Sequence, residues 1–304
     1  MVPLNERTEA GMAQPEVASI WKGPNELGES PNWNCRENAL YWVDINGQKI
    51  QRLDPETDIV TVWDAPMKIG SIVFREQGGL VAGMHAGFHF VDLETGSFTY
   101  IIDPDPDHPS TRLSDGKCDR RGRYWCGSMD MNLKDPLGAL YRLDTDLSCT
   151  KMAEGVVVSN GLGWSPDDKV LYYANSRGNT VYAFDFDIET GEIENRRDFI
   201  STEDIPGRVD GATVDAEGCY WAAHIDGWEV AQYDPQGQRM RTIPMPVRYP
   251  SMCSFGGKKL DVLYVTSIGY EVQPGDKELS PLGGALFAIY GTDATGIPEP
   301  FFAG

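Results

Sequence analysis

The stretch LYWVDINGQKIQRLDP, Leu40–Pro55, combines two short apolar and aromatic runs with an Asn-Gly turn between them. This pattern is typical of a β-hairpin. The first run recurs in altered form along the chain, as LVAGM at Leu80, RYWCGSM at Arg123, VLYYANS at Val170, CYWAAH at Cys219 and VLYVTS at Val262. The hairpin is therefore one copy of an internal repeat, and the repeat decides the fold.

The repeat has the length of a propeller blade. Equivalent positions are Trp42, Val81, Trp125, Tyr173, Trp221 and Val265, which are separated by 39, 44, 48, 48 and 44 residues. Four-stranded blades have this length. We predict an all-β fold, a six-bladed β-propeller with four-stranded blades. The strand near Val17 has no blade of its own, so we expect it to close the ring against the last blade. Residues 1–14 are predicted to be a flexible tail and 15–304 a single propeller domain.

Composition narrows the possible partners. The net charge of −20 disfavours nucleic acid and anionic membranes, which require basic patches. No secretory leader or transmembrane segment is apparent. The six cysteines occur singly, never as CxxC, which favours reduced thiols and a cytoplasmic location. We expect a monomer or a weak dimer that acts on a small molecule.

A second segment precedes the aromatic strand in each repeat and is predicted to be the innermost strand of its blade. At one register of this segment the six repeats carry Glu29, Gly70, Ser114, Asn160, Asp210 and Ser251. Innermost strands surround the central channel, so these residues are expected to ring one of its ends.

Three members of this ring offer oxygen ligands. Glu29 and Asp210 are carboxylates and Asn160 is an amide, and two buried carboxylates repel each other unless a cation lies between them. Such a set suits Ca²⁺, Mg²⁺, Mn²⁺, Fe²⁺ or Zn²⁺. Asn and Asp also cap turns, which is the alternative for each residue taken singly. Together they predict one divalent metal in the channel.

Other motifs are weaker or absent. His85 and His89 have the i, i+4 spacing of a zinc pair, but their surroundings predict two strands and a turn instead of the required helix. The sequence contains no GxSxG, GxGxxG or P-loop motif. His224 follows the strand YWAA and is a candidate for lining the pocket.

Four motifs in order, within GESPNW, RLSDGKCDRRGRYWCGSM, SNGLGWSPDDKVLYYANS and VDGATVDAEGCYWAA, resemble the senescence-marker-protein, gluconolactonase and regucalcin family. The resemblance extends from about Trp21 to Ile289. It implies a six-bladed propeller that binds one divalent metal through Glu29, Asn160 and Asp210 and opens sugar lactones. The family's substrate-binding Arg corresponds to Arg112. Ser114 replaces a family Asn, which implies a larger pocket, and Asn132 stands where some members carry a substrate-binding Glu.

We therefore expect a metal-dependent lactonase. The metal would polarise the lactone carbonyl, Asp210 would accept the proton of the attacking water and Arg112 would orient the substrate. Two alternatives remain open at this point. The first is a phosphotriesterase-like hydrolase that uses the same metal ring, and the second is a propeller that binds a divalent cation without turnover.

Overall fold

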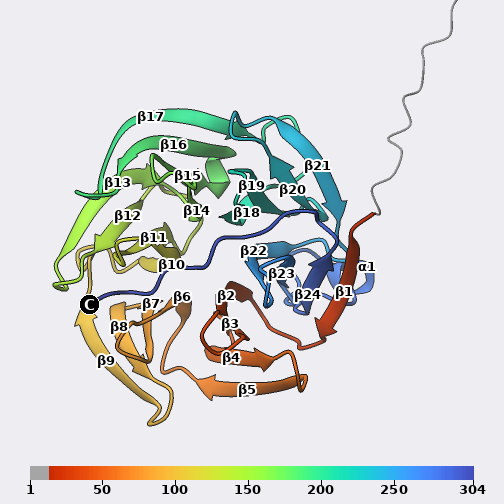
Figure 1. Cartoon of the computed structure of the whole chain (residues 1–304), viewed down its shortest axis with the longest axis horizontal. Coiled ribbons are helices and arrows are strands. Elements are labelled where there is room, and N and C mark those ends of the chain that lie inside the picture. The colour runs from red at the N-terminus through yellow and green to blue at the C-terminus, as the bar shows by residue number, and fades with distance from the viewer. Residues whose placement is uncertain (1–13) are drawn as a thin grey trace, which may run out of the picture.

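The computed structural model describes residues 14–304, which form six antiparallel sheets of four strands each. The sheets are arranged radially around a central channel, and in each sheet the strand that carries the ring position lies innermost (Figure 1). The predicted six-bladed β-propeller is confirmed. The tail predicted for residues 1–14 lies almost wholly outside the described residues.

The first three blades follow one another along the chain. Blade 1 comprises β2 (Gly28–Asn34), β3 (Ala39–Asp44), β4 (Lys49–Asp54) and β5 (Ile59–Asp64). Blade 2 comprises β6 (Ile69–Phe74), β7 (Leu80–Met84), β8 (Gly87–Asp92) and β9 (Ser97–Ile102). Blade 3 comprises β10 (Thr111–Cys118), β11 (Tyr124–Asp130), β12 (Gly138–Leu143) and β13 (Cys149–Val156).

The second three blades contain the short helices. Blade 4 comprises β14 (Ser159–Trp164), β15 (Val170–Asn175), the 3₁₀ helix η1 (Ser176–Gly178), β16 (Thr180–Asp187) and β17 (Glu192–Ser201). Blade 5 comprises β18 (Arg208–Val214), β19 (Tyr220–Ile225), β20 (Glu229–Tyr233) and β21 (Arg239–Pro244). Blade 6 comprises β22 (Pro250–Gly256), β23 (Val262–Ser267), the helix α1 (Asp276–Leu279), β24 (Leu286–Tyr290) and β1 (Glu16–Trp21).

The N-terminal strand closes the ring. β1 pairs antiparallel with β24, with Val17 opposite Ile289, so the last blade is built from both ends of the chain. This pairing covers the edge that β24 would otherwise expose, which agrees with the prediction for the strand near Val17. Within residues 14–304, no helix is long and apolar enough to cross a bilayer.

Buried tryptophans explain the repeating aromatic strand. Trp125 and Trp221 are fully buried between blades, and each donates its indole N–H at 2.8 Å to an aspartate, Asp119 or Asp215. The same carboxylates accept backbone N–H groups of the turn that precedes the aromatic strand. A buried indole needs a hydrogen-bond acceptor. This bond accounts for the aspartate that stands six residues before the tryptophan in both repeats.

Every innermost strand is interrupted at the same place. The pairing between the first and second strand of each blade shifts register beside the ring position, for example between Asn160 and Gly163 in blade 4 and between Val209 and Ala212 in blade 5. Such β-bulges change the direction in which side chains point. They lie where the sequence placed the ring of candidate ligands.

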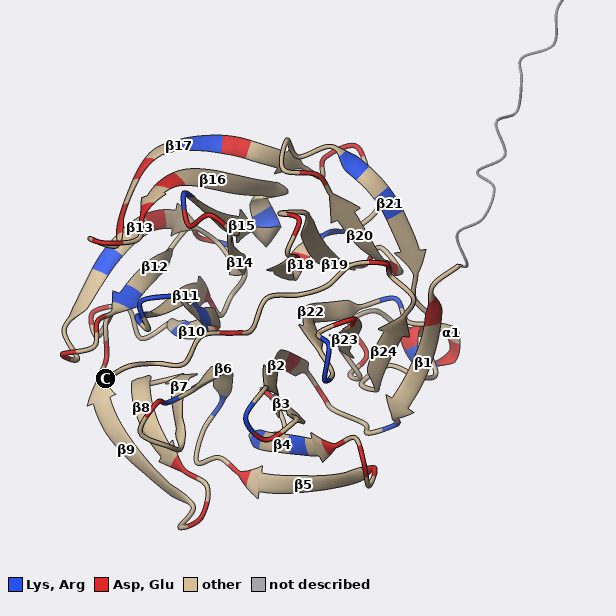
Figure 2. Ribbon diagram, in the orientation of Figure 1, with Lys and Arg blue, Asp and Glu red and all other residues tan. Residues whose placement is uncertain are grey.

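The C-terminal segment, residues 291–304, crosses the propeller at one end of the channel (Figure 1). Its backbone is hydrogen-bonded to the backbone of four blades, at Leu260 of blade 6, Ala216 of blade 5, Gly122 of blade 3 and Phe74 of blade 2. Phe302 is fully buried against the core of blade 3. Acidic residues are spread over the turns around the rim (Figure 2). The six cysteines are free thiols, as predicted.

Candidate functional site

A cavity of about 200 Å³ lies at the end of the channel where the innermost strands begin. Glu29, Asn160 and Asp210, the predicted metal ligands, all line it, and so do Arg112 and Ser114. The first three come from blades 1, 4 and 5, which are far apart in the sequence. The propeller fold therefore brings five of the predicted site residues into one cavity.

The bulge after Asn160 shows why the SNGLGW motif takes its form. Gly161 has φ +60°, a conformation that side chains other than glycine rarely adopt. A Cβ at this position would also clash with the Tyr220 hydroxyl, which donates to the Gly161 carbonyl at 2.8 Å. The Leu162 N–H then donates to Asp115 Oδ2 at 3.2 Å. These contacts fix the backbone that carries Asn160 toward the cavity.

Asn160 and Asp210 contact each other directly. The Asn160 Nδ2 donates to Asp210 Oδ1 and, at 3.0 Å, to Ser176 Oγ. Glu29 accepts the N–H of Ser30 through Oε2 at 3.1 Å. All three ring side chains are largely buried, with 6 to 9% of each residue exposed.

Burial and neighbouring negative charges raise the pKa of both carboxyls. The pKa of Glu29 lies well above its ordinary value, first because of desolvation and then because of the charges of Asp210 and Asp115. Desolvation also raises the pKa of Asp210, while the nearby charge of Arg208 opposes this rise. Two carboxyls that resist ionisation side by side would be stabilised by a cation.

The donor set fits a hard divalent cation. One oxygen of each ring side chain, Glu29 Oε1, Asn160 Oδ1 or Asp210 Oδ2, accepts no hydrogen bond from residues 14–304. None of these oxygens is among the fully buried orphaned atoms of the described chain. The same part of the chain holds no group of three His, Cys, Asp or Glu side chains suited to a metal. A site here would therefore need the amide as its third protein ligand, and oxygen-only sets of this kind suit hard cations.

Arg112 and Asp115 complete the inner wall. Arg112 is half-buried and donates to the Leu113 carbonyl at 2.9 Å, and its charge lowers the pKa of Glu29 and Asp210. Asp115 is 4% exposed, and its Oδ1 has no hydrogen-bond partner among the described residues. Sequence reasoning named its neighbour Ser114 and missed Asp115, although DG follows Ser114 in the motif.

Two predicted substrate contacts lie away from the cavity lining. Asn132 is exposed in the loop after β11, where its amide donates to Asp130 Oδ1 at 3.3 Å. His224 is fully buried behind the wall and bonds through Nε2 to the Tyr233 hydroxyl at 2.9 Å. His85 lies in the turn between β7 and β8, and His89 lies within β8, so the predicted two strands and a turn are confirmed.

Further cavity residues came from positions without a motif. Arg177 of η1 and Arg208 at the start of β18 line the wall together with Ser176. Tyr270 and Val272, from the loop after β23, are 40% and 44% exposed and form part of the rim. Of these residues, only Arg208 could have been predicted from the sequence, because it lies two residues before Asp210 in the same strand.

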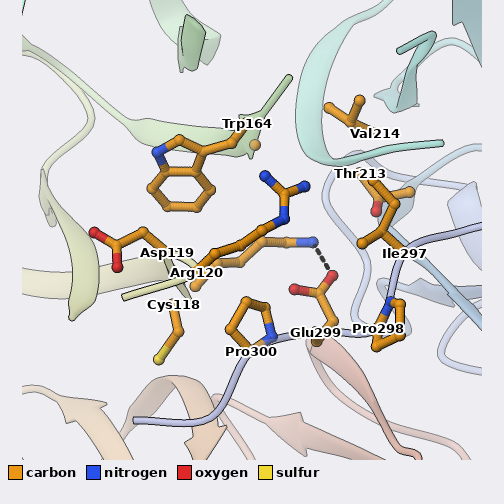
Figure 3. Close-up of a pocket in the computed structure, with 12 residues that line it drawn as sticks. Cys118, Asp119, Arg120, Trp164, Thr213, Val214, Ile297, Pro298, Glu299 and Pro300 are labelled. Atoms are coloured by element: carbon orange, nitrogen blue, oxygen red, sulfur yellow. Dashed lines mark hydrogen bonds and ion pairs between the residues drawn. The ribbon is translucent and has the colours of Figure 1, made fainter. Parts of the chain in front are cut away.

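The opposite end of the channel is narrower. There a pocket of about 40 Å³ is lined by the C-terminal segment, including Ile297 and Glu299, and by the ends of the innermost strands. Glu299 Oε1 lies 2.7 Å from Lys117 Nζ. The dashed line at Glu299 in Figure 3 marks this ion pair. Both side chains are mostly buried, with 6% of Lys117 and 16% of Glu299 exposed. The two ends of the channel therefore differ in size and in charge pairing.

Comparison with known proteins identifies the family of the chain. The family model described as SMP-30/Gluconolactonase/LRE-like region matches residues 27–269. Regucalcin of Danio rerio is 37% identical over 96% of this chain and all of its own length. A 6-deoxy-6-sulfogluconolactonase of Pseudomonas putida is 35% identical over 94% of this chain and 98% of its own.

A solved structure shows the same fold. A luciferin-regenerating enzyme superposes with a TM-score of 0.90 and 27% identity, covering 95% of this chain and 99% of that protein. The family match includes the strands that carry Glu29, Asn160 and Asp210. The chain belongs to the SMP-30/gluconolactonase/LRE-like family.

Proposed function

We propose that the protein is a metal-dependent hydrolase that opens a sugar lactone to its hydroxy acid. One observation carries the proposal: Glu29, Asn160 and Asp210 present oxygens without hydrogen-bond partners in the described chain to a single buried cavity. Further support comes from the family description and from the relative named as a 6-deoxy-6-sulfogluconolactonase.

These three residues would hold the cation, and Ca²⁺, Mg²⁺, Mn²⁺, Fe²⁺ and Zn²⁺ are all compatible with such ligands. When bound, a divalent cation supplies Lewis-acid chemistry to the carbonyl and lowers the pKa of water. Asn160 is held by Ser176, so its orientation does not depend on Asp210 alone.

Asp210 is our candidate for the base. Its raised pKa suits a group that takes up a proton. Water oxygen attacks the carbonyl carbon while Asp210 accepts the water proton. The ring C–O bond then breaks, and the same proton passes to the departing ring oxygen. The product is the open hydroxy acid, and Asp210 returns to its starting form.

Arg112 is proposed to orient the carbonyl. It lines the cavity and lies close enough to Glu29 and Asp210 to lower the pKa of each carboxyl. A fixed guanidinium favours the negative charge that develops on the carbonyl oxygen during attack. Ser114 is small, which leaves room beside Arg112 for ring substituents.

The test is acid release from a panel of aldono-1,4- and 1,5-lactones. Chelator-stripped protein receives one divalent metal at a time, and Glu29→Gln is compared with Glu26→Gln, an exposed glutamate three residues earlier. We expect metal-dependent turnover that Glu29→Gln lowers at least about 100-fold, because it replaces a negatively charged ligand by a neutral amide that binds a cation more weakly, and that Glu26→Gln leaves unchanged. Metal binding without turnover of any lactone would instead favour a cation-binding propeller, and turnover of organophosphates alone would favour a phosphotriesterase.

The base assignment has its own test. Asp210→Asn removes the proton acceptor and keeps an oxygen ligand in place. We expect turnover to fall at least about 100-fold while metal affinity, measured by calorimetry, falls less. Turnover close to wild type would show that another group takes the proton.

We further infer a cytoplasmic location and a monomeric or weakly dimeric state. The first is supported by the six free thiols, which include the exposed Cys35 and suit a reducing compartment. Sedimentation of the purified protein over a concentration series would test the second.

A further inference from the structure

Two arginines stand at the outer part of the same cavity. Arg177 lies on η1, directly after β15, and Arg208 opens β18, an element that contacts η1. Both residues line the cavity that holds Glu29, Asn160 and Asp210. Arg177 is exposed and Arg208 half-buried, so a ligand entering from solvent can reach them.

Neither guanidinium forms an ion pair with a described residue. Among residues 14–304, no carboxylate lies within ion-pair distance of Arg177 or Arg208, and neither side chain donates a hydrogen bond. Other arginines are paired, such as Arg121 with Glu189 and Arg123 with Asp119. With 46 acidic and only 26 basic residues in the chain, two unpaired arginines in one cavity are unexpected.

The two positive charges also affect each other. After desolvation, the charge of Arg208 is the next cause that lowers the pKa of Arg177. Like charges held this close are unfavourable until an anion separates them. Guanidinium groups bind carboxylate, sulfonate and phosphate oxygens through paired N–H donors.

The spacing along β18 sets the distance between Arg208 and Asp210, the proposed base. Arg208 and Asp210 are two residues apart in β18, and both line the cavity although the strand bulges between Val209 and Ala212. Two steps along a strand span about 6.6 Å. An anion at Arg208 would therefore lie at the other end of a sugar-sized ligand whose carbonyl is close to Asp210.

We propose that Arg177 and Arg208 form a subsite for an anionic substituent of the lactone, carried on the carbon farthest from the carbonyl. This inference rests on the proposed lactonase function and adds a substrate class to it. The substituent is a phosphate, sulfonate or carboxylate. A pair that only held the carboxylate of the product would treat neutral and anionic lactones alike, so the two roles can be separated.

The first experiment compares matched lactones. Glucono-1,5-lactone is compared with its 6-phosphate and its 6-deoxy-6-sulfonate and with a lactone that carries a 6-carboxylate, using wild type, Arg177→Gln, Arg208→Gln and the double variant. The readout is the ratio of kcat/KM for each anionic lactone to that for the neutral one. We expect each single variant to lower this ratio roughly tenfold, because it removes charged hydrogen bonds. The anion with the highest wild-type ratio identifies the substituent.

Arg196→Gln serves as the matched control. Arg196 is an exposed arginine on the outer strand β17 of blade 4, the blade that also carries Arg177, and it packs over Tyr182. It should leave both kcat/KM values unchanged. A ratio that stays at its wild-type value in Arg177→Gln and in Arg208→Gln, with both variants folded by thermal melting, overturns the subsite.

The second experiment does not depend on turnover. Calorimetry measures the binding of 6-phosphogluconate and of gluconate to the full-length protein and to the variants. Tighter binding of 6-phosphogluconate that the Arg177→Gln and Arg208→Gln substitutions abolish supports the subsite even if no lactone is hydrolysed, a result that would count against the lactonase function alone. Equal affinity for the two acids in wild type overturns the subsite and leaves the lactonase function to its own test.

Discussion

At the narrow end of the channel, Lys117 and Glu299 form an ion pair. At the opposite end, which holds the cavity of Glu29, Asn160 and Asp210 and is called the wide end below, like charges lie close together. Glu29 and Asp210 repel one another there, and so do Arg177 and Arg208. The narrow end is crossed by the C-terminal segment, and the wide end is bordered by exposed loop residues. Interactions that stabilise the fold therefore gather at one end, and unsatisfied groups available to a ligand gather at the other.

The largest effect on stability is expected at the narrow end. Glu299→Gln leaves the buried Lys117 without its partner and should lower the free energy of unfolding by about 3 to 5 kcal/mol. Replacing both residues by apolar ones, Lys117→Met with Glu299→Leu, should recover most of this loss. Urea denaturation measures both.

Arg36→Gln is the control for this prediction. Its ion pair with Glu76 is exposed at both partners, so its loss should change stability by less than about 1 kcal/mol. If Glu299→Gln were no less stable than Arg36→Gln, the narrow end would not have the stabilising role described above.

At the wide end, removal of one charged side chain should not lower the stability of the protein. Glu29→Gln removes one of two repelling carboxyls, so the chelated variant should melt no lower than wild type. A divalent cation at 100 times its Kd should stabilise wild type by about 2.7 kcal/mol and the variant hardly at all. Thermal melts with and without chelator provide the measurement, and an equal rise in both proteins would argue against Glu29 as a ligand.

A smaller effect concerns His224, which is buried behind the wall of the wide end among Tyr233, Glu229 and Arg239. Desolvation, assisted by the charge of Arg239, lowers its pKa to about 4. The unfolded chain, with an ordinary value of about 6.5, binds more protons below that pH. The contribution of neutral His224 is therefore present above pH 6.5 and is lost as the pH falls toward 4.

This loss amounts to about 2 kcal/mol between pH 7 and pH 5. His224→Asn does not titrate and should lose correspondingly less stability over that range. Urea denaturation at the two pH values gives the comparison, and equal losses in wild type and variant would exclude a neutral, buried His224 as the cause.

The smallest effect is that of salt. Raising NaCl from about 50 to about 500 mM shortens the screening length and should lower kcat/KM for an anionic lactone a few-fold. The neutral lactone should be much less affected. A salt response of equal size for both substrates would remove electrostatic attraction by Arg177 and Arg208 as its source.

Much of the wide end could be predicted from sequence because it follows the repeat. Glu29, Asn160 and Asp210 occupy one register of a regular fold, so aligning the repeats also aligned their positions in space. Arg177 and Arg208 were missed because a short helix and a strand start have no counterpart at that register. For Asn132 and His224, nearness in sequence to inner strands did not determine side-chain direction.

The narrow end was not anticipated at all. Residues 291–304 show no period-two pattern, and only two isolated bridges, from Gly296 and Phe302, link them to the blades in the described chain. Their position depends on single backbone hydrogen bonds to four blades and on the burial of Phe302. Contacts of this kind depend on residues of several blades and leave little local signature in the sequence.

The ring of bulged strands also limits how this protein could acquire new specificity. At Gly70 a side chain would meet the Leu113 carbonyl at 2.5 Å, and the Ser251 hydroxyl is already bonded to the Gly28 carbonyl. The hydroxyl of Ser114 borders the cavity and has no hydrogen-bond partner in residues 14–304. The other three ring positions hold the candidate ligands. Position 114 is therefore the ring position where a substitution could reshape the pocket without disturbing the blades. It is the first position to vary in directed evolution of substrate specificity.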